Sequence, residues 1–351
     1  MKIVASGRQI TMGIDMGSSM LDINVRSGEE VLKRTKIRYE RAAIESFLSR
    51  FPNCQIKAVY EAGCFGYWLY DTLTELGVEV TVTPPSKMPR APGERVKTDG
   101  RDSDMLSKEH QAGNLRAVPV PTKEQRAERQ LVRTHRQLVQ TRVRTMVQIR
   151  SFLEFHHIEI PREIKKKWSA AFLGWLQSMD FTGTPGGQFL RRSLDALLRM
   201  YRELTDEVNA LKKEIAEMAK SKRYAKAATV LESTAGIGPL TAMTILTEVS
   251  RIDRFPTSQQ FSSYLGLTPS EHSSSETQHR GHITKTGNTH IRGILVESCW
   301  AWIRRDKSAY TTYRRIARRR EPKRAIVAMA RRLATKIYWQ LRTMKYNDLS
   351  A

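Results

Sequence analysis

The sequence contains little cysteine and no long hydrophobic run. Its three cysteines, Cys54, Cys64 and Cys299, do not have the spacing of a metal-binding motif. This low count argues against a disulfide-stabilised secreted protein and is typical of the reducing cytoplasm, where we expect the protein to reside. No stretch of about 18 apolar residues occurs, which excludes a transmembrane helix, and the first residues lack the pattern of a signal peptide.

Acidic residues are scarce relative to basic ones. The 351 residues include 59 Lys and Arg against 36 Asp and Glu, a formal net charge of +23. Such an excess favours a polyanionic partner. It is densest between residues 301 and 351, which hold 15 basic and 3 acidic residues. We interpret this run as a nucleic-acid contact rather than a solvated helix face or a membrane-binding surface. Its central members are Arg314, Arg315, Arg318, Arg319, Arg320, Lys323 and Arg324.

The length allows two or three domains, and the pattern changes twice along the chain. Residues 1–118 alternate strand and helix signals. Three strand-like runs at 9–15, 20–26 and 29–37 precede a helix, a strand, a helix and a strand, and residues 98–111 are predicted to be helical. This α/β order is similar to the ribonuclease-H-like core.

Residues 119–226 are predicted to be helical. Residues 124–155 form one long basic helix, and after a Pro- and Gly-containing break a second helix carries an apolar seam with alternating spacings of four and three. Such a seam predicts a coiled coil. Two alternatives stay open, a hairpin with the preceding helix and a dimerisation arm. The seam residues are Leu190, Leu194, Leu197, Tyr201, Leu204, Val208, Leu211, Ile215 and Met218.

Residues 227–351 are predicted to be mostly helical. Gly236 and Gly238 separate two helical runs and resemble the phosphate-binding turn of a helix-hairpin-helix, although an ordinary helix–helix turn fits equally well. The polar stretch 270–288 lies between helical segments and is too long for a simple connector, which favours a functional loop.

Four acidic residues have positions that suggest a metal site. Asp15 ends the first predicted strand, Glu61 ends the fourth, and Asp99 and Asp102 share one face of a helix. Adjacent strand ends and one helix face can gather these carboxylates at one edge of a sheet. Hard oxygen ligands suit Mg²⁺ or Mn²⁺, and paired ions of this kind serve phosphoryl transfer. The segment 13–19, "GIDMGSS", also resembles the first phosphate loop of actin-like ATPases, but the second glycine-rich loop of those proteins is missing.

Together, "GIDMG", "YEAG", "KTDGRDSDML", "AGIGPLTA", "YLGLTP", "EHSSS" and "KTGNTHIRGIL" resemble the DEDD transposases of the insertion-sequence 110/1111 family, relatives of the Piv invertase. The resemblance spans nearly the whole chain in order. It implies a RuvC-like domain (1–118), a coiled-coil region (119–226) and a C-terminal transposase domain (227–351). It also implies that the metal-binding tetrad is Asp15, Glu61, Asp99 and Asp102.

The resemblance further implies a serine nucleophile in the loop. The family pattern Ser-Ser-Gly corresponds to residues 273–275, which favours Ser274, with Ser273 and Ser275 as alternates. Arg280, Lys285 and Arg292 surround this loop and are expected to neutralise the DNA phosphate. The implied partners are donor DNA, target DNA, a structured noncoding guide RNA and further copies of the chain, as a dimer or tetramer.

These expectations give a leading hypothesis and two alternatives. The leading hypothesis is an RNA-guided DNA recombinase that cuts and rejoins strands through a serine–phosphodiester intermediate. The first alternative is a Holliday-junction-type nuclease that uses metal-activated water, and the second is a non-catalytic nucleic-acid-binding protein.

Overall fold

The computed structural model describes residues 7–85, 99–271 and 280–346. The side chains of residues 99–101 and 280 lie outside the described part. The chain divides into two compact units, residues 1–120 and 121–351. This division falls two residues from the first boundary expected from the sequence, whereas the three-domain organisation stays a prediction.

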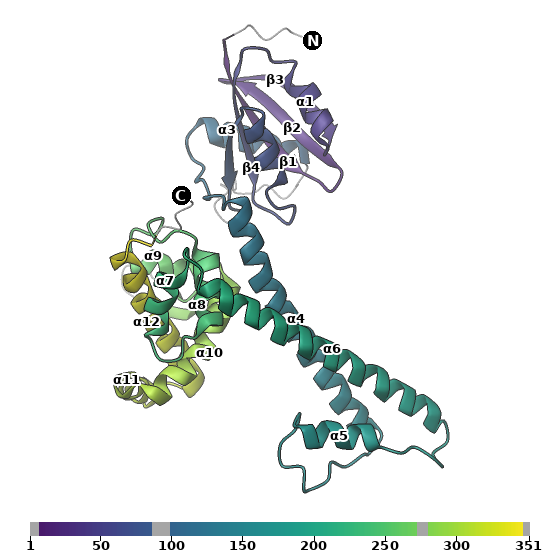
Figure 1. The fold of residues 1–351 in the computed structure, drawn as a ribbon. Helices are drawn as coiled ribbons and strands as arrows, with labels where there is room; N and C mark the ends of the chain where they lie inside the picture. Colours follow the sequence, from purple (N-terminus) through teal and green to yellow (C-terminus); the bar gives the residue numbers. More distant parts are fainter. Residues whose placement is uncertain (1–6, 86–98, 272–279, 347–351) are drawn as a thin grey trace. The chain divides into compact units, whose positions relative to one another are not determined.

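The first unit is built on a five-stranded mixed sheet (Figure 1). The strand order is β3-β2-β1-β4-β5, with β1, β2 and β3 antiparallel and β4 and β5 parallel to β1. This is the meander followed by alternating helices and strands that the sequence predicts. The strands are β1 (Gln9–Met16), β2 (Met20–Ser27), β3 (Glu30–Arg38), β4 (Gln55–Glu61) and β5 (Glu79–Thr83).

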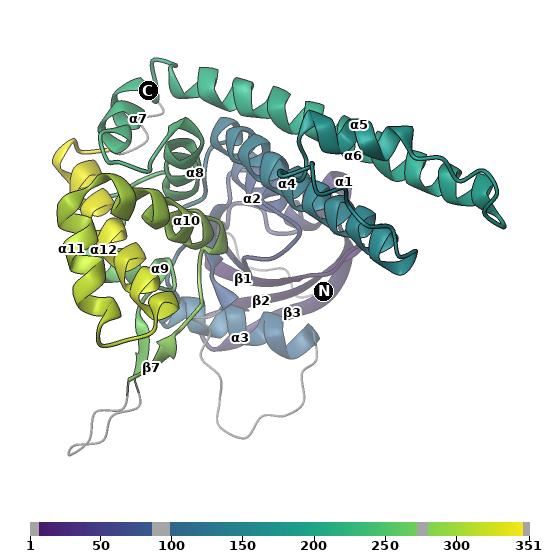
Figure 2. The same cartoon turned by 90° about the horizontal axis from the view of Figure 1, so that it is seen from below.

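The two faces of this sheet are covered differently. Ile10, Met12 and Ile14 of β1 pack in one apolar core with helices α1 (Arg41–Leu48) and α2 (Trp68–Glu75). Since side chains alternate along a strand, Gly13 and Asp15 face the other side. Helix α3 (Asp99–Gln111) covers that side, as Figure 2 shows.

The second unit begins with two long helices that pack against each other. They are α4 (Lys123–Phe155) and α6 (Gly187–Ala219), with the short helix α5 (Ala170–Ser178) at their far end (Figure 1). Leu194, Tyr201, Val208, Leu211 and Ile215 of the predicted seam are all buried. Within the chain, α6 therefore packs on α4 as a hairpin, one of the two arrangements the seam allows. Dimerisation through this arm stays a prediction.

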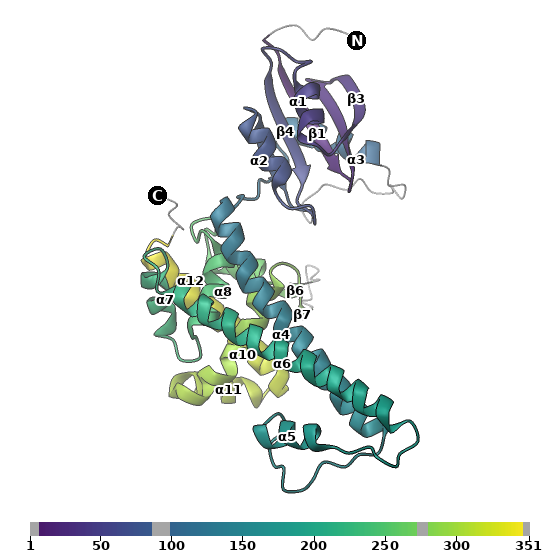
Figure 3. The same cartoon turned by 45° about the vertical axis from the view of Figure 1, so that its right-hand side comes forward.

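The remaining helices enclose the largest core. Val132 of α4 and Ile215 of α6 belong to this core, so the base of the arm is continuous with the C-terminal helices. Two antiparallel strands, β6 and β7, which are labelled in Figure 3, lie between α9 and α10 in the sequence. No helix in the described ranges is long and apolar enough to cross a membrane. The elements are α7 (Ala225–Glu232), α8 (Pro239–Val249), α9 (Ser258–Tyr264), β6 (Pro269–Glu271), β7 (Arg280–Ile283), α10 (Thr289–Arg305), α11 (Lys307–Ala317) and α12 (Pro322–Thr343).

Candidate functional site

Two of the predicted acids lie next to each other at one end of the sheet. Asp15 is the penultimate residue of β1, and Glu61 is the last residue of β4. The parallel register pairs Ile14 with Tyr60, so Asp15 and Glu61 follow side by side, with their side chains on the same face. Both are half-buried.

Helix α3 lies on that same face and comes unusually close to β1. A Cβ at Gly13 would overlap the Ser103 carbonyl oxygen and would lie 2.5 Å from the Ser107 amide nitrogen. Glycine therefore permits α3 to rest directly on the strand backbone. Asp15, two residues after Gly13, points toward the side of the sheet that α3 covers.

The first turn of α3 lies over the end of the sheet that carries Asp15. The Ser103 hydroxyl donates a hydrogen bond to Asp22 Oδ1 at 3.3 Å, and Asp22 is the cross-strand partner of Asp15. Asp102 directly precedes Ser103 and is half-buried. Asp15 and Glu61 therefore share one end of the sheet face, and the turn of α3 that carries Asp102 lies over the same end.

The fourth predicted acid begins the same helix. The backbone of Asp99 opens α3, three residues before Asp102, while its side chain is outside the described part. Among the described side chains, no three His, Cys, Asp or Glu residues are close enough together to hold a metal ion. The set consists only of carboxylates, which fits Mg²⁺ or Mn²⁺ and does not fit a soft metal.

A polar network that the sequence analysis missed holds α3 on the sheet. Asp104 Oδ1 accepts hydrogen bonds from Arg26 Nη2 at 2.7 Å and from Asn24 Nδ2 at 3.1 Å. Asn24 is completely buried, and its Oδ1 accepts a hydrogen bond from Ser107. Asp104 is therefore a residue that holds α3 on the sheet. The alternating pattern of β2, with Asp22, Asn24 and Arg26 on one face, was the available signal.

The predicted nucleophilic serines lie in the sequence between β6 and β7. Ser273, Ser274 and Ser275 fall within 272–279, outside the described residues. The register pairs Glu271 with Arg280, which places the two ends of this segment opposite each other.

Comparison with known proteins assigns the chain to a family. A family model described as Transposase IS116/IS110/IS902 family matches residues 228–314, and a DEDD transposase model of IS110 matches residues 12–158. A putative transposase, y4qE, of Sinorhizobium fredii is 33% identical over 86% of this chain and 74% of its own length. The chain belongs to the IS110 family of transposases. The transposase for insertion sequence element IS1111A of Coxiella burnetii is 25% identical over 88% of this chain and 84% of its own.

The two family models cover the proposed site residues of this IS110-family chain. The DEDD model's range contains Asp15, Glu61, Asp99 and Asp102, and the range of the other model contains residues 273–275. A probable family 20 transposase of Pseudomonas aeruginosa is 28% identical over 84% of both chains. Membership of this family makes the chain a DNA-processing enzyme.

Two of the predicted phosphate contacts flank the serine segment. Lys285 is exposed and adopts the left-handed conformation, with φ of 56°. Arg292 Nη1 donates to the carbonyl oxygens of Leu265, at 3.0 Å, and Thr286, at 3.3 Å. In this transposase, the Arg292 guanidinium therefore links the two segments at the base of the β6–β7 pair. The side chain of Arg280 is outside the described part.

The two glycines of the predicted phosphate-binding turn differ. Gly236 has φ of 90°, and a Cβ there would lie 2.5 Å from the Ser298 carbonyl oxygen of α10. Close helix packing therefore accounts for this glycine. Gly238 is the N-cap residue of α8, and no described atom lies within 4 Å of the position of its Cβ. Phosphate binding at this turn stays a prediction.

The C-terminal basic residues lie at the end of α11, in the turn that follows it and in the first turn of α12, and we call this set the basic patch. There Tyr310, beneath the Arg314 guanidinium, is 49% exposed. Arginine and aromatic side chains together suit both phosphates and bases. The basic members, all of them exposed, are Arg314, Arg315, Arg318, Arg319, Arg320, Lys323 and Arg324.

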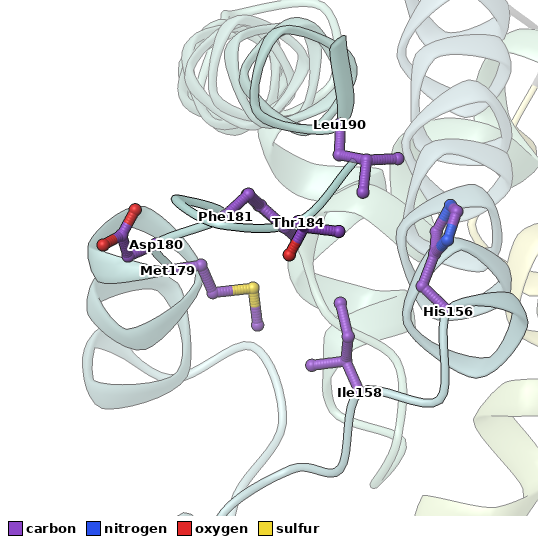
Figure 4. A pocket seen from close by; sticks show the side chains of 7 residues that line it. All are labelled: His156, Ile158, Met179, Asp180, Phe181, Thr184 and Leu190. Atoms are coloured by element: carbon purple, nitrogen blue, oxygen red, sulfur yellow. The ribbon is translucent and has the colours of Figure 1, made fainter. Parts of the chain in front are cut away.

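A cavity of about 270 Å³ lies at the far end of the arm (Figure 4). His156 and Ile158 follow α4, Met179 follows α5, and Leu190 opens the seam of α6. The wall is mostly apolar, and all of the predicted catalytic residues lie elsewhere in the sequence. We assign the cavity no catalytic role.

Proposed function

We propose that this transposase is an RNA-guided DNA recombinase that cuts and rejoins strands through a serine–DNA ester. The observation that supports the proposal is that Asp15 and Glu61 lie side by side at one end of the sheet face that α3 covers, with Asp102 in the first turn of α3. These residues are far apart in the sequence and have the chemistry that phosphoryl transfer needs. The RuvC-like assignment of the first unit is part of this proposal.

The metal ligands in this proposal are Asp15, Glu61, Asp99 and Asp102. Four carboxylates in one place repel one another and raise one another's proton affinity unless positive charge compensates them. Bound Mg²⁺ or Mn²⁺ supplies that charge and, in paired sites, stabilises the attacking and leaving oxygens of a phosphodiester. The protein itself contributes by holding α3 at a fixed distance from β1.

Ser274 is the proposed nucleophile. Its Oγ forms an ester bond to the DNA phosphorus as the bond from phosphorus to the leaving sugar oxygen breaks. The Oγ proton leaves during the attack, and the sugar oxygen takes up a proton. The ester conserves the phosphodiester bond energy for rejoining to a second strand. Exposed Lys285 is the described cation proposed to neutralise the phosphate, since the Arg292 guanidinium is hydrogen-bonded to main-chain oxygens.

The nucleic-acid partners are proposed from charge and family resemblance. The basic patch at the α11–α12 turn supports binding to a phosphate backbone, which is independent of sequence. Target choice would then belong to a guide RNA that pairs with donor and target DNA. Since the serine and the tetrad lie in different units, a site shared between two copies of the chain is part of this proposal.

The test uses three purified variants and the wild type. The probe is the DNA flanking this reading frame, with RNA transcribed from that flank. We expect Asp15→Asn to abolish cleavage and Ser274→Ala to abolish both strand exchange and the covalent protein–DNA adduct. Glu109→Gln, which changes a carboxylate on α3 outside the tetrad, should keep activity within about twofold.

Each contrary outcome identifies an alternative. Cleavage without an adduct in the wild type and in Ser274→Ala would indicate a nuclease that uses metal-activated water. Adduct formation by Ser274→Ala would move the nucleophile to Ser273 or Ser275, which the corresponding single variants would separate. Metal-independent binding with no cleavage by any variant would leave a nucleic-acid-binding protein.

A further inference from the structure

The chain segments on either side of the β6–β7 pair meet in a tightly packed neck, residues 264–269 and 283–288. The Asn288 amide donates to the Tyr264 carbonyl oxygen at 2.9 Å, and the Thr284 amide donates to the Thr268 carbonyl oxygen at 2.9 Å. A Cβ at Gly266 would overlap the Thr286 carbonyl oxygen. The two segments are therefore closer than any side chain between them would permit.

A second glycine, in the opposite neck segment, makes a similarly close contact. Gly287 has φ of 83°, and a Cβ there would lie 2.9 Å from the Tyr264 carbonyl carbon. Because both glycines also adopt left-handed φ, substitution at either position strains the backbone as well as the contact. Because the two segments are packed so closely, a contact that fixes the neck to the rest of the unit would also fix the position of β6 and β7.

Glu248, the penultimate residue of α8, provides that fixing point. Its Oε2 accepts a hydrogen bond from Asn288 Nδ2 at 2.8 Å, and its main-chain oxygen lies 3.4 Å from the Tyr264 hydroxyl. Asn288 Nδ2 is also 3.2 Å from the Tyr264 hydroxyl. Glu248 thus contacts a residue of each neck segment.

The same carboxylate is held from the other side by the arm. Arg133 of α4 donates from Nε to Oε1 at 2.6 Å and from Nη2 to Oε2 at 2.9 Å. Arg129 contributes a second positive charge, with its Nε 3.9 Å from Oε2. Burial by itself raises the pKa of Glu248, but the hydrogen bonds and charges of these arginines outweigh it and lower the pKa.

Stability alone does not explain this arrangement. The Glu248 side chain is only 2% exposed, so its charge carries a desolvation cost. An apolar pair of similar volume often stabilises a protein as well as a buried ion pair does. An apolar pair could not accept the hydrogen bond from the side-chain amide of Asn288. The other side-chain atom of Asn288, Oδ1, caps α10 by accepting from the Ile291 amide.

We propose that Glu248 is a positioning residue, which ties the neck to arm helix α4 and so fixes the ends of β6 and β7, between which the predicted serine nucleophile lies in the sequence. This inference rests on the proposed function, because it concerns the placement of the nucleophile. Glu248 acts through Asn288 and Tyr264 and does not itself touch the DNA.

Two variants break the anchor in different ways. Asn288→Ser keeps an N-cap oxygen for α10 but removes the amide that donates to Glu248. The double variant Arg133→Met/Glu248→Met removes the buried carboxylate together with its bidentate partner, while Arg129 keeps its hydrogen bonds to the Thr247 carbonyl oxygen and the Ser250 hydroxyl. Gln340→Met is the matched control, since it removes side-chain hydrogen bonds to Val230 and Thr234 in the same unit.

Hydrogen exchange and adduct formation are measured on the same full-length proteins. We expect both anchor variants to raise the exchange rates of the Thr284, Lys285 and Asn288 amides at least about tenfold, with α12 unchanged. The rate of the Ser274–DNA adduct should fall about 10- to 100-fold, because a misplacement of about 1 Å has that effect. Binding of the flanking DNA and its RNA should stay within about twofold, as in Gln340→Met.

The outcomes separate the positioning role from the proposed function. If hydrogen exchange at the neck did not change in the anchor variants, Glu248 would not hold the neck, regardless of the adduct rate. If exchange became faster but the adduct rate did not change, Glu248 would have no positioning role. Equal losses of binding, melting temperature and adduct would show a purely structural role. A wild type that binds DNA but forms no adduct would refute the proposed function, while exchange would still decide whether Glu248 anchors the neck.

Discussion

Replacing Gly13 with alanine should push helix α3 away from the sheet. The new Cβ would overlap the Ser103 carbonyl oxygen and would lie 2.5 Å from the Ser107 nitrogen, whereas ordinary contact begins at 3.4 Å. Both obstacles are backbone atoms, so no side-chain rotation can relieve them. Helix α3 must retreat by about 1 Å or the strand must bend, at a cost of about 1 to 3 kcal/mol.

This retreat should affect activity more than stability. A loss of about 1 to 3 kcal/mol lowers the melting temperature of a unit of this size by about 4 to 20 °C. A displacement of about 1 Å in Asp99 and Asp102 should reduce metal-dependent cleavage about 100-fold. Thermal unfolding followed by circular dichroism and a cleavage assay at saturating Mg²⁺ measure the two effects below the melting temperature.

The control for Gly13→Ala is Gly174→Ala in α5. No described atom lies within 4 Å of the position of that Cβ, and the residue is helical. We expect this variant to gain up to about 1 kcal/mol from helix propensity and to keep its activity. If Gly13→Ala melted and cleaved like the wild type, the close contact between α3 and β1 could not be what positions the acids.

Three further predictions concern other parts of the chain. Arg319→Glu/Arg320→Glu should weaken nucleic-acid binding and reduce the slope of log K against log salt by about 1 for each phosphate that is no longer neutralised, as a salt titration would measure. Burial raises the pKa of the Cys299 thiol to about 12, so mass spectrometry after alkylation of the native protein should find exposed Cys64 modified and Cys299 intact. Asp104→Asn should cost about 1 to 2 kcal/mol in denaturant unfolding, because a buried arginine loses its carboxylate partner.

The elements of the first unit were predictable because each strand and helix has a local pattern. Alternation identified all five strands, and the carboxyl ends of β1 and β4 then placed Asp15 and Glu61 together. The polar network at Asn24 and Asp104 was not found, since it depends on which helix covers the polar face. The polar face of β2 is visible in its sequence, but the helix that pairs with it is not.

In the second unit, the periodicity of apolar residues predicts a helix but does not identify its packing partner. A seam of apolar residues on α6 has the same spacing whether its partner helix belongs to the same chain or to another. The structure shows α4 as a partner within the chain. Helix α5 and the strands β6 and β7 were not predicted, because each is too short for a clear period.

The two proposed parts of the active site share one kind of contact. A glycine removes the Cβ where two backbones must touch, at Gly13 beneath α3 and at Gly266 in the neck, and a buried charged group then fixes the contact. The ion pair of Asp104 with Arg26 fixes α3, which carries two of the proposed acids. Glu248 fixes the neck next to the segment that contains the proposed serine. Glycine alone permits close approach but does not enforce it, and an ion pair alone tolerates variation in spacing. Only the combination defines a position to within about 1 Å, which is the precision that phosphoryl transfer demands.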